Sequence, residues 1–262
     1  MSEISAWMTK RIESLRIVEN KKLSKDIFVL ELTGTGRIPE MKPGQFVQAK
    51  IEGSPETFLR RPLSIHDVNY SQNTFRLLVQ IAGKGTEALS KLRTGDSVNL
   101  IYPLGNSFSL PVKGERILLT GGGCGVAPLL FLGKYLKSNG FAPDILLGFR
   151  SSERIIEYNE YSELGKVFLT TEDGSLGTKG FITDHPVLPA NRYDVIYCCG
   201  PDPMMKAVSG YCKEQNIRCE VSLENLMGCG IGACLCCVVD TVKGNMCACT
   251  DGPVFNINDL KW

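Results

Sequence analysis

The cysteines near the C-terminus constrain this chain most. Six of its 11 cysteines lie within the last 34 of 262 residues, at positions 229, 234, 236, 237, 247 and 249. Three of them, Cys229, Cys234 and Cys237, follow the spacing C-x4-C-x2-C, and Cys249 lies twelve positions further on. Such an uneven distribution and an odd number fit a general disulfide framework poorly. We therefore expect this segment to hold metal.

The C-x4-C-x2-C spacing is typical of plant-type [2Fe–2S] sites, in which four thiolates hold two irons. Glycines in the loop would let backbone amides turn toward the sulfur atoms. Zinc is the alternative, because Cys234/Cys237 with Cys247/Cys249 imitate the two short pairs of a zinc site. The glycine-rich x4 loop favours the iron–sulfur cluster. Cys236 and Cys247 do not keep the x4/x2 spacing and are predicted to be free thiols.

Short strand-like runs fill the first 112 residues, and Gly and Pro separate them. These runs are rich in β-branched and aromatic residues and lie at 27–32, 45–51, 74–82 and 97–101. Several short strands with turns between them indicate a β-barrel or a β-sandwich, and we predict an antiparallel β-barrel.

Beyond residue 112, apolar runs alternate with helical stretches. The runs lie at 116–120, 145–148, 167–170 and 194–198, and the helices are expected at 127–138 and 204–215. This alternation predicts a Rossmann-like parallel sheet. We therefore expect a multidomain chain, part all-β and part α/β: a barrel over 1–112, a nucleotide-binding domain over 113–222 and a metal module over 223–262.

Glycine-rich loops follow two of the predicted parallel strands. The first holds Gly121, Gly122, Gly123, Gly125 and Pro128. Glycines there let the backbone approach a pyrophosphate, whose charge the start of the following helix favours. The second holds Cys199, Gly200 and Pro201, and should lie at the same sheet edge, with Cys199 against a nicotinamide ring. A tight strand-to-helix turn and simple packing of the cysteine are the alternatives.

The barrel half contains two further candidate phosphate sites. Arg61 and Leu63 point to one face of an extended chain, and Arg offers a bidentate fork for phosphate. Ser64 adds a hydroxyl, and the Gly-Lys-Gly-Thr run at 83–86 precedes a short helix. A surface strand with a basic pair, Arg60 and Arg61, is the alternative.

Charge and hydropathy exclude several other classes of function. The net charge of +1 gives no support for binding nucleic acid or anionic lipid. The N-terminus has no apolar stretch typical of a secretory signal. The longest uncharged run, 117–133, is interrupted by glycines and a proline, so a membrane span is not expected. The predicted location is the cytoplasm.

These motifs occur in one order along the chain: 61–64 (Arg-Pro-Leu-Ser), 85–86, 121–128, 199–201 and then the cysteines. In this order the whole chain resembles the ferredoxin reductase family of flavoproteins. Within it, the chain resembles the electron-transfer subunits of class 1B, NAD-linked dihydroorotate dehydrogenases. The most specific stretches are 220–234 and 251–255 (Asp-Gly-Pro-Val-Phe).

The resemblance implies FAD on the barrel, NAD on the parallel-sheet domain and [2Fe–2S] at the C-terminus. It implies that FAD is bound by Arg61, Pro62, Leu63, Ser64, Leu78, Val79, Gln80, Gly85 and Thr86. It also marks Cys249 as the fourth cluster ligand. The wider family has a Tyr stacked on the flavin where this chain has Leu63. The short gap between Cys237 and Cys249 implies a compact module.

The resemblance further implies a function in pyrimidine biosynthesis. An FMN-containing partner would oxidise dihydroorotate, and its electrons would pass through the cluster and FAD to NAD⁺. We expect two copies of each chain and diaphorase-type activity for this chain alone. Ile231 and Leu235 are expected near the contact, and shielding of the cluster is the alternative role for them. The alternatives are a subunit of another NAD(P)H-linked complex, such as a ferredoxin:NADP or hydrogenase-linked reductase, and a zinc-containing nucleotide-sensing module.

Overall fold

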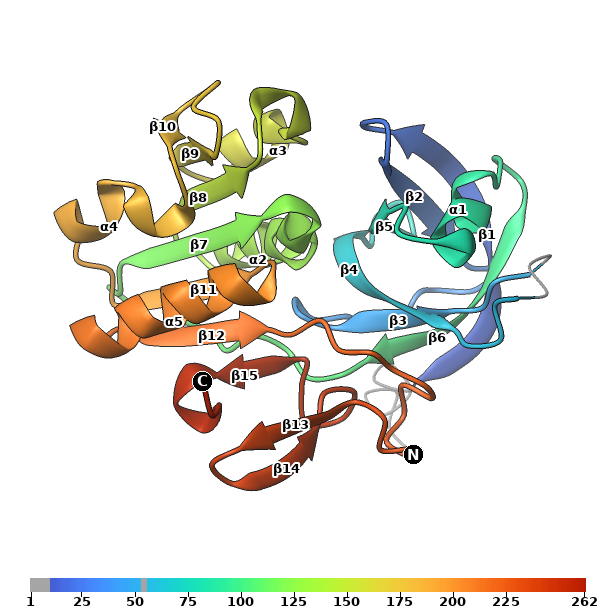
Figure 1. Cartoon of the computed structure of the whole chain (residues 1–262). Coiled ribbons are helices and arrows are strands. Elements are labelled where there is room, and N and C mark those ends of the chain that lie inside the picture. The colour runs from blue at the N-terminus through green and yellow to red at the C-terminus, as the bar shows by residue number, and fades with distance from the viewer. Residues whose placement is uncertain (1–9, 53–55) are drawn as a thin grey trace. The chain divides into compact units, whose positions relative to one another are not determined.

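In the computed structural model, which describes residues 10–52 and 56–262, six antiparallel strands close into a barrel (Figure 1). Around the barrel the order is β1-β2-β5-β4-β3-β6. The strands are β1 (Arg11–Lys22), β2 (Ile27–Thr33), β3 (Phe46–Ala49), β4 (Arg61–Asn69), β5 (Thr74–Gln80) and β6 (Ser97–Leu104), and helix α1 is Lys84–Ser90. The predicted antiparallel barrel is confirmed.

Alternating side chains build the barrel core. In β1 the buried residues Leu15 and Ile17 alternate with exposed or half-exposed ones. Leu30 and Leu32 of β2 and Leu77 of β5 are buried in the same way. Because successive strand residues point to opposite faces, this pattern places one apolar face inside the barrel.

The second sheet is the predicted parallel one. Its order is β10-β9-β8-β7-β11-β12-β15, and all neighbours are parallel except β12 and β15. The strands are β7 (Ile117–Gly122), β8 (Asp144–Phe149), β9 (Val167–Thr171), β10 (Thr178–Lys179), β11 (Val195–Cys199), β12 (Arg218–Ser222) and β15 (Val254–Asn256). The helices are α2 (Ala127–Ser138), α3 (Tyr158–Ser162), α4 (Val187–Ala190) and α5 (Asp202–Gln215). In Figure 1, α2 and α5 lie on opposite faces of this sheet, which explains why β7 and β11 are buried throughout.

Two compact units contain these sheets. Unit 1 holds the barrel up to Ser107 with Glu224–Val239 and Met246–Pro253. Unit 2 holds Phe108–Leu223, Asp240–Asn245 and Val254–Trp262. Most of the cysteine segment therefore packs with the barrel. The hairpin of β13 (Val238–Thr241) and β14 (Gly244–Cys247) interrupts this segment, and its turn region, Asp240–Asn245, belongs to unit 2. The domain boundaries at residues 112 and 222 stay predictions.

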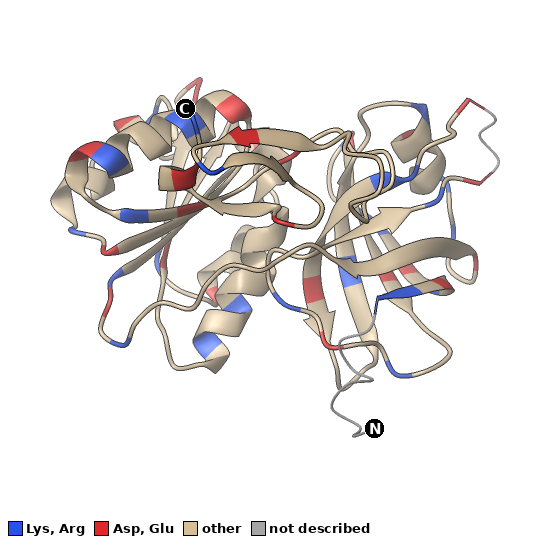
Figure 2. Cartoon of the chain, turned by 90° about the horizontal axis from the view of Figure 1, so that it is seen from below, with Lys and Arg blue, Asp and Glu red and all other residues tan. Residues whose placement is uncertain are grey.

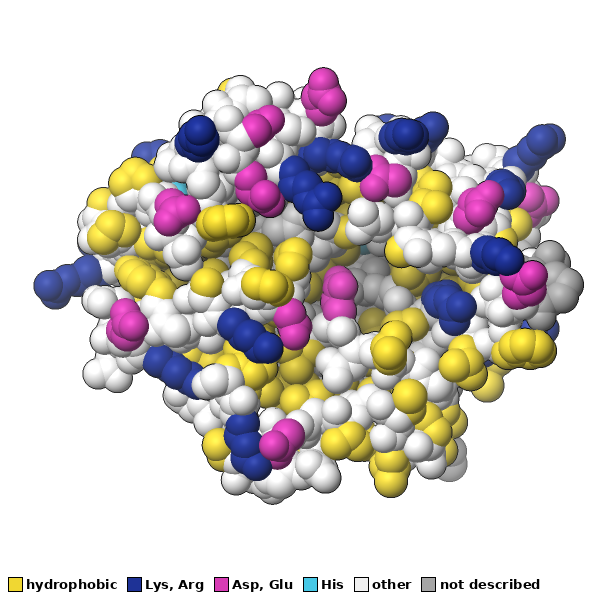
Figure 3. All heavy atoms as spheres, in the orientation of Figure 1, with side chains coloured by type: hydrophobic (Ala, Val, Ile, Leu, Met, Phe, Trp, Pro, Cys, Tyr) yellow, Lys and Arg dark blue, Asp and Glu magenta, His cyan; other side chains and the backbone are white. Residues whose placement is uncertain are grey.

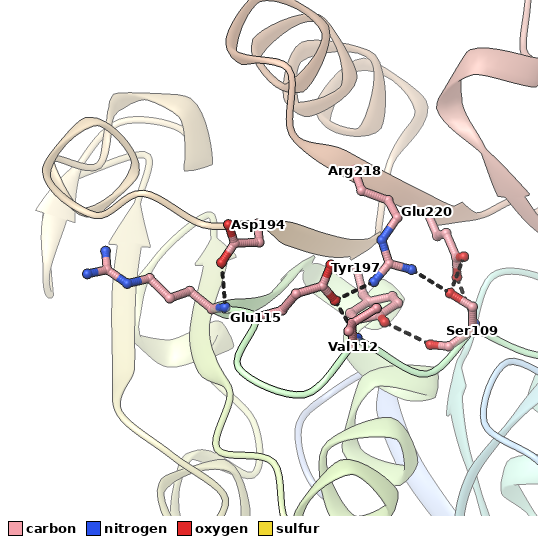
Figure 4. Close-up of polar contacts among 8 residues, drawn as sticks. Ser109, Val112, Glu115, Asp194, Tyr197, Arg218 and Glu220 are labelled. Carbon is pink, nitrogen blue, oxygen red and sulfur yellow. Dashed lines mark hydrogen bonds and ion pairs between the residues drawn. The ribbon is translucent and has the colours of Figure 1, made fainter.

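A polar network fixes the segment that precedes β7 (Figure 4). The carboxylate of Glu220 accepts from the backbone N–H of Ser109 at 2.9 Å and from its hydroxyl at 2.5 Å. The hydroxyl of Tyr197 donates to the Ser109 carbonyl at 2.7 Å. Arg218 forms an ion pair with Glu115 at 2.7 Å. These contacts tie the segment to the neighbouring strands β11 and β12.

Charged side chains of both signs are interspersed along the ribbon (Figure 2). This distribution agrees with the net charge of +1. Among the described helices, none is long and apolar enough to cross a membrane.

Candidate functional site

Backbone amides of the C-x4-C loop converge on one thiol. The Sγ of Cys229 accepts from the N–H groups of Ile231 at 3.4 Å, Ala233 at 3.3 Å and Cys234 at 3.4 Å. These amides, that of Ile231 first, lower the pKa of the Cys229 thiol to about 6. The loop thus favours the thiolate, which is the form that binds metal.

Two glycines give this loop its shape. Gly230 and Gly232 have φ of 72° and 87°, which favours glycine. A Cβ on Gly232 would lie 2.8 Å from Cγ2 of Thr250, and one on Gly230 would lie 2.5 Å from Cγ of Gln48. The loop is therefore both turned and tightly covered.

The candidate ligands lie as two neighbouring pairs. Cys234 donates its backbone N–H to Cys229 Sγ, and Cys229 returns a backbone N–H to Cys234 Sγ at 3.4 Å. Cys237 and Cys249 are buried, and burial, followed by a hydrogen bond with the Cys237 thiol, raises the pKa of Cys249 to about 12. Two pairs of thiols fit a cluster in which each of two irons takes two thiolates. Within the described chain, no group of three or more His, Cys, Asp or Glu side chains is arranged to hold a single metal ion.

The tail after Cys249 is bound to the end of the barrel. Asn106 donates its backbone N–H to the Gly252 carbonyl at 2.6 Å and its side-chain amide to the Asp251 carbonyl at 2.7 Å. The carboxylate of Asp251 accepts from the N–H of Cys247 at 2.7 Å. A Cβ on Gly105, where φ is 77°, would lie 2.5 Å from Cδ of Pro253. The sequence analysis did not single out Asn106 or Gly105.

Arg60, which directly precedes β4, and Arg61, its first residue, have different surroundings. Arg60 donates through Nη1 to the carbonyls of Gln48 at 3.1 Å and Asn99 at 3.0 Å, and through Nη2 to Oδ1 of Asn99 at 2.5 Å. It therefore ties β3 to β6. The guanidinium of Arg61 donates to the carbonyl of Leu59 at 2.9 Å.

Arg61 also lies beside the second candidate phosphate site. A Cβ on Gly85 would lie 3.1 Å from Arg61 Nε, so the two segments are in close contact there. The hydroxyl of Thr86 accepts from the N–H groups of Ala82 at 2.9 Å and Gly83 at 3.3 Å and shapes the turn before α1. Two predicted FAD segments, 61–64 and 85–86, are thus brought together, and their donors fit an anionic cofactor.

The other predicted FAD residues lie on β4 and β5. Pro62, Leu63 and Ser64 are half-buried on β4. Leu78 and Val79 are buried on β5, and the exposed Gln80 donates to Asp26 at 3.2 Å.

The two glycine-rich loops of unit 2 meet at one sheet edge, as predicted. Gly121 pairs with Cys199 in register, and a Cβ on Gly125 would collide with Gly200. A Cβ on Gly122 would lie 2.6 Å from Sδ of Met204, a residue of α5 that the sequence analysis did not place in the site. Cys199 is buried at the end of β11, and Gly123 and Pro128 lie at the start of η2 (Gly123–Val126) and α2. Gly200 and Pro201 lead into α5. The two loops therefore pack closely on each other, and of the glycines between 121 and 125 it is Gly123, with φ of 56°, where a Cβ would meet nothing within 4 Å.

Apolar side chains are exposed around the cysteine loop. Their exposed fractions range from 40% to 88% for Leu226, Ile231, Leu235 and Val238. Figure 3 shows apolar side chains at the lower right of this face. Exposed apolar side chains that gather in this way are typical of contact surfaces.

The barrel with its arginine strand, the parallel sheet with its glycine-rich edge and the paired thiols define an oxidoreductase of the ferredoxin reductase type. Two family descriptions match the chain: the iron–sulfur cluster binding domain of dihydroorotate dehydrogenase B at residues 224–261 and the oxidoreductase FAD-binding domain at residues 14–108. The dihydroorotate dehydrogenase B (NAD(+)) electron transfer subunit of Lysinibacillus sphaericus (strain C3-41) is 41% identical over 94% of this chain and 96% of that protein. The subunit of the same name from Geobacillus sp. (strain WCH70) is 39% identical over 95% of this chain and 98% of that one. The chain belongs to this family of electron transfer subunits.

Solved structures agree with the fold. A structure of an NADH-dependent reduced ferredoxin-NADP oxidoreductase has a TM-score of 0.86 and 31% identity, covering 95% of this chain and 90% of that chain. Phthalate dioxygenase reductase has a TM-score of 0.64 and 21% identity, covering 77% of this chain and 64% of that chain, and supports the fold alone. The iron–sulfur match favours the cluster over the zinc alternative.

Proposed function

We propose that this chain is the electron-transfer subunit of an NAD-linked dihydroorotate dehydrogenase in pyrimidine biosynthesis. The observation that carries the proposal is that unit 1 holds both the paired thiols and the predicted FAD strand. Relatives named electron transfer subunits match this chain over nearly their full length. Electrons would enter through the cluster and leave through FAD to NAD⁺.

Four cysteines of unit 1 are the proposed cluster ligands. Cys229, Cys234, Cys237 and Cys249 hold the cluster, and the loop amides stabilise the Cys229 thiolate. The cluster supplies one-electron transfer, and FAD joins single electrons into a hydride.

The proposed FAD site lies on the barrel. Arg61 binds a phosphate with its guanidinium, Gly85 lets the turn before α1 lie close to Arg61, and Thr86 holds that turn. The flavin ring is oriented by the remaining candidate residues of the two strands, which are Pro62, Leu63 and Ser64 of β4 and Leu78, Val79 and Gln80 of β5.

The proposed NAD site lies at the edge of the parallel sheet. Gly123, where a Cβ would meet nothing within 4 Å, leaves its backbone open to the pyrophosphate of NAD. Gly121, Gly122 and Gly125 shape the turn by close packing, and Gly200 and Pro201 complete that edge. We place Cys199, buried at the strand end, against the nicotinamide ring.

The partner is an FMN-containing enzyme that oxidises dihydroorotate, in a complex with two copies of each chain. The exposed apolar side chains of Ile231 and Leu235 lie in the cysteine loop region and are the proposed contact points. A one-electron carrier needs its donor nearby, so the contact belongs near the cluster. For the compartment we propose the cytoplasm, where thiols stay reduced.

A second candidate function is a subunit of another NAD(P)H-linked complex. The 31% identity to an NADH-dependent reduced ferredoxin-NADP oxidoreductase supports it. Preference for NADPH over NADH by tenfold or more in a diaphorase assay would favour this candidate.

The isolated chain, purified without oxygen, tests the cofactors. We expect about two irons per chain, visible cluster and flavin absorbance, about one FAD, and NADH-dependent reduction of an artificial acceptor. A colourless protein with one zinc and no iron would contradict the proposal.

A further inference from the structure

The side chain of Gln48 is fully buried, with 0% exposure, and neither of its amide atoms has a hydrogen-bond partner among the described residues. Burying an amide without partners is unfavourable, and buried polar groups in folded proteins are nearly always satisfied. An amide that is buried and unsatisfied in the protein alone therefore indicates a partner outside the protein chain.

Gln48 lies between the two proposed cofactor segments of unit 1. Its backbone pairs with Pro62 in the antiparallel register of β3 and β4, so it adjoins the predicted FAD strand. Its side chain lies against the cysteine loop, because a Cβ on Gly230 would be 2.5 Å from its Cγ and 2.6 Å from its Nε2. Gly230 directly follows Cys229.

Neighbouring residues hold the backbone of Gln48 and cover its face of β3. Arg60 holds the Gln48 carbonyl at 3.1 Å, which fixes the backbone from which the side chain projects. Phe46 lies two residues earlier on the same face and packs closely against Gly105, because a Cβ on Gly105 would lie 2.9 Å from the Phe46 ring. This face of β3 is therefore covered by the cysteine segment and its docking contacts.

We propose that the side-chain amide of Gln48 donates an N–H hydrogen bond to the iron–sulfur cluster when the cluster is bound. The inference rests on the proposed cluster site and adds a side-chain donor from the barrel to the backbone donors of the loop. Hydrogen bonds to the sulfur atoms favour the reduced, more negative cluster and raise its reduction potential. Gln48 would thereby set the potential at the junction of the two cofactor sites.

The test is a redox titration of the isolated holoprotein, followed by the electron paramagnetic resonance signal of the reduced cluster. Gln48→Met keeps the length of the side chain and removes the donor. We expect it to favour the oxidised cluster by about three- to tenfold, which lowers the potential by about 30–60 mV for a one-electron couple. Gln72→Met, at an exposed turn between β4 and β5, is the matched control and should leave the potential unchanged.

Iron content and Tm are measured on every variant. If Gln48→Met loses its iron or fails to fold, Gln48→Leu, which is also neutral and has no donor, is titrated instead and should also lower the potential. An unchanged or raised potential in a folded variant with full iron overturns the inference but leaves the proposed function intact. A wild-type chain without a cluster overturns both.

Discussion

At the scale of single residues, Arg60 and Arg61 show how neighbours of one type divide their roles. Arg60 ties β3 to β6 through Gln48 and Asn99, whereas Arg61 lies beside Gly85. From residue type alone the two could form a basic pair on a surface strand, and the resemblance singled out Arg61. In the fold, Arg60 lies before β4 and reaches Asn99, whereas Arg61 begins the strand.

We predict that Arg61→Ala weakens FAD binding by about ten- to hundredfold, because a charge-assisted hydrogen bond contributes about 1.5–3 kcal/mol. Fluorescence titration of the apoprotein with FAD measures the change. Arg60→Ala should mainly lower stability, by about 1–3 kcal/mol, through loss of its contacts with Asn99 and Gln48. Equal weakening of FAD binding by both variants would show that the two arginines are not divided in this way.

A second residue-scale prediction concerns the Cys229 thiol in the cluster-free protein. Its pKa of about 6 lies below the usual thiol value, so the thiolate forms as the pH rises through about 6. The stability that the thiolate contributes is therefore present above the pKa of the unfolded thiol and is lost as the pH falls through about 6. At pH 7, we expect iodoacetamide to label Cys229 faster than Cys249, whose pKa is raised to about 12. Peptide mass spectrometry measures this order, and faster labelling of Cys249 would contradict it.

At the scale of elements, the segment before β7 depends on its polar clamp. Glu115 accepts from the N–H of Val112 at 2.6 Å and pairs with Arg218, and both charged side chains are partly buried. The same Arg218 donates to the hydroxyl of Ser109 at 3.0 Å. A segment without regular structure is thereby fixed against β12.

We predict that Arg218→Ala lowers stability by about 1 kcal/mol, or about 2–4 °C in Tm. Glu115→Ala should cost a similar amount, and the double variant less than the sum, because the residues share one interaction. Glu115→Gln keeps an acceptor for Val112 and should cost less than Glu115→Ala. Thermal unfolding of the cofactor-loaded protein gives the Tm of all four variants. Strictly additive losses in the double variant would show that the ion pair between Arg218 and Glu115 does not contribute to stability.

Elements also differed in how far the sequence predicted them. Helix α2 begins at Ala127 and ends at Ser138, as expected, because Gly and Pro mark its start. Strand β1 was not predicted, since charged residues such as Arg11, Glu13 and Arg16 interrupt its apolar residues. Strand β12 was also missed, and its neighbour β15 comes from the far end of the chain. Pairing between distant segments leaves no local signal.

At the scale of the whole molecule, the sequence predicted the barrel, the parallel sheet and the order of the motifs. Periodic apolar patterns and glycine turns are local, so they can be read along the chain. The packing of the cysteine segment with the barrel could not be predicted, because it depends on contacts such as those of Asn106 with Asp251 and Gly252. Gln48 was missed for the same reason, since its contact with Gly230 joins distant positions.

The central claim is that electrons reach NAD⁺ through the cluster of this chain. The most direct test is to co-express the chain with a dihydroorotate-oxidising FMN subunit, purify through a tag on one of them, and measure NADH formed from dihydroorotate. We predict that both chains co-purify, that both are required, and that Cys234→Ala abolishes NAD⁺ reduction while the partner still reduces an artificial acceptor. Cys236→Ala, an exposed neighbouring thiol, should retain NAD⁺ reduction. Failure to co-purify, or NAD⁺ reduction that survives in Cys234→Ala, would contradict this route.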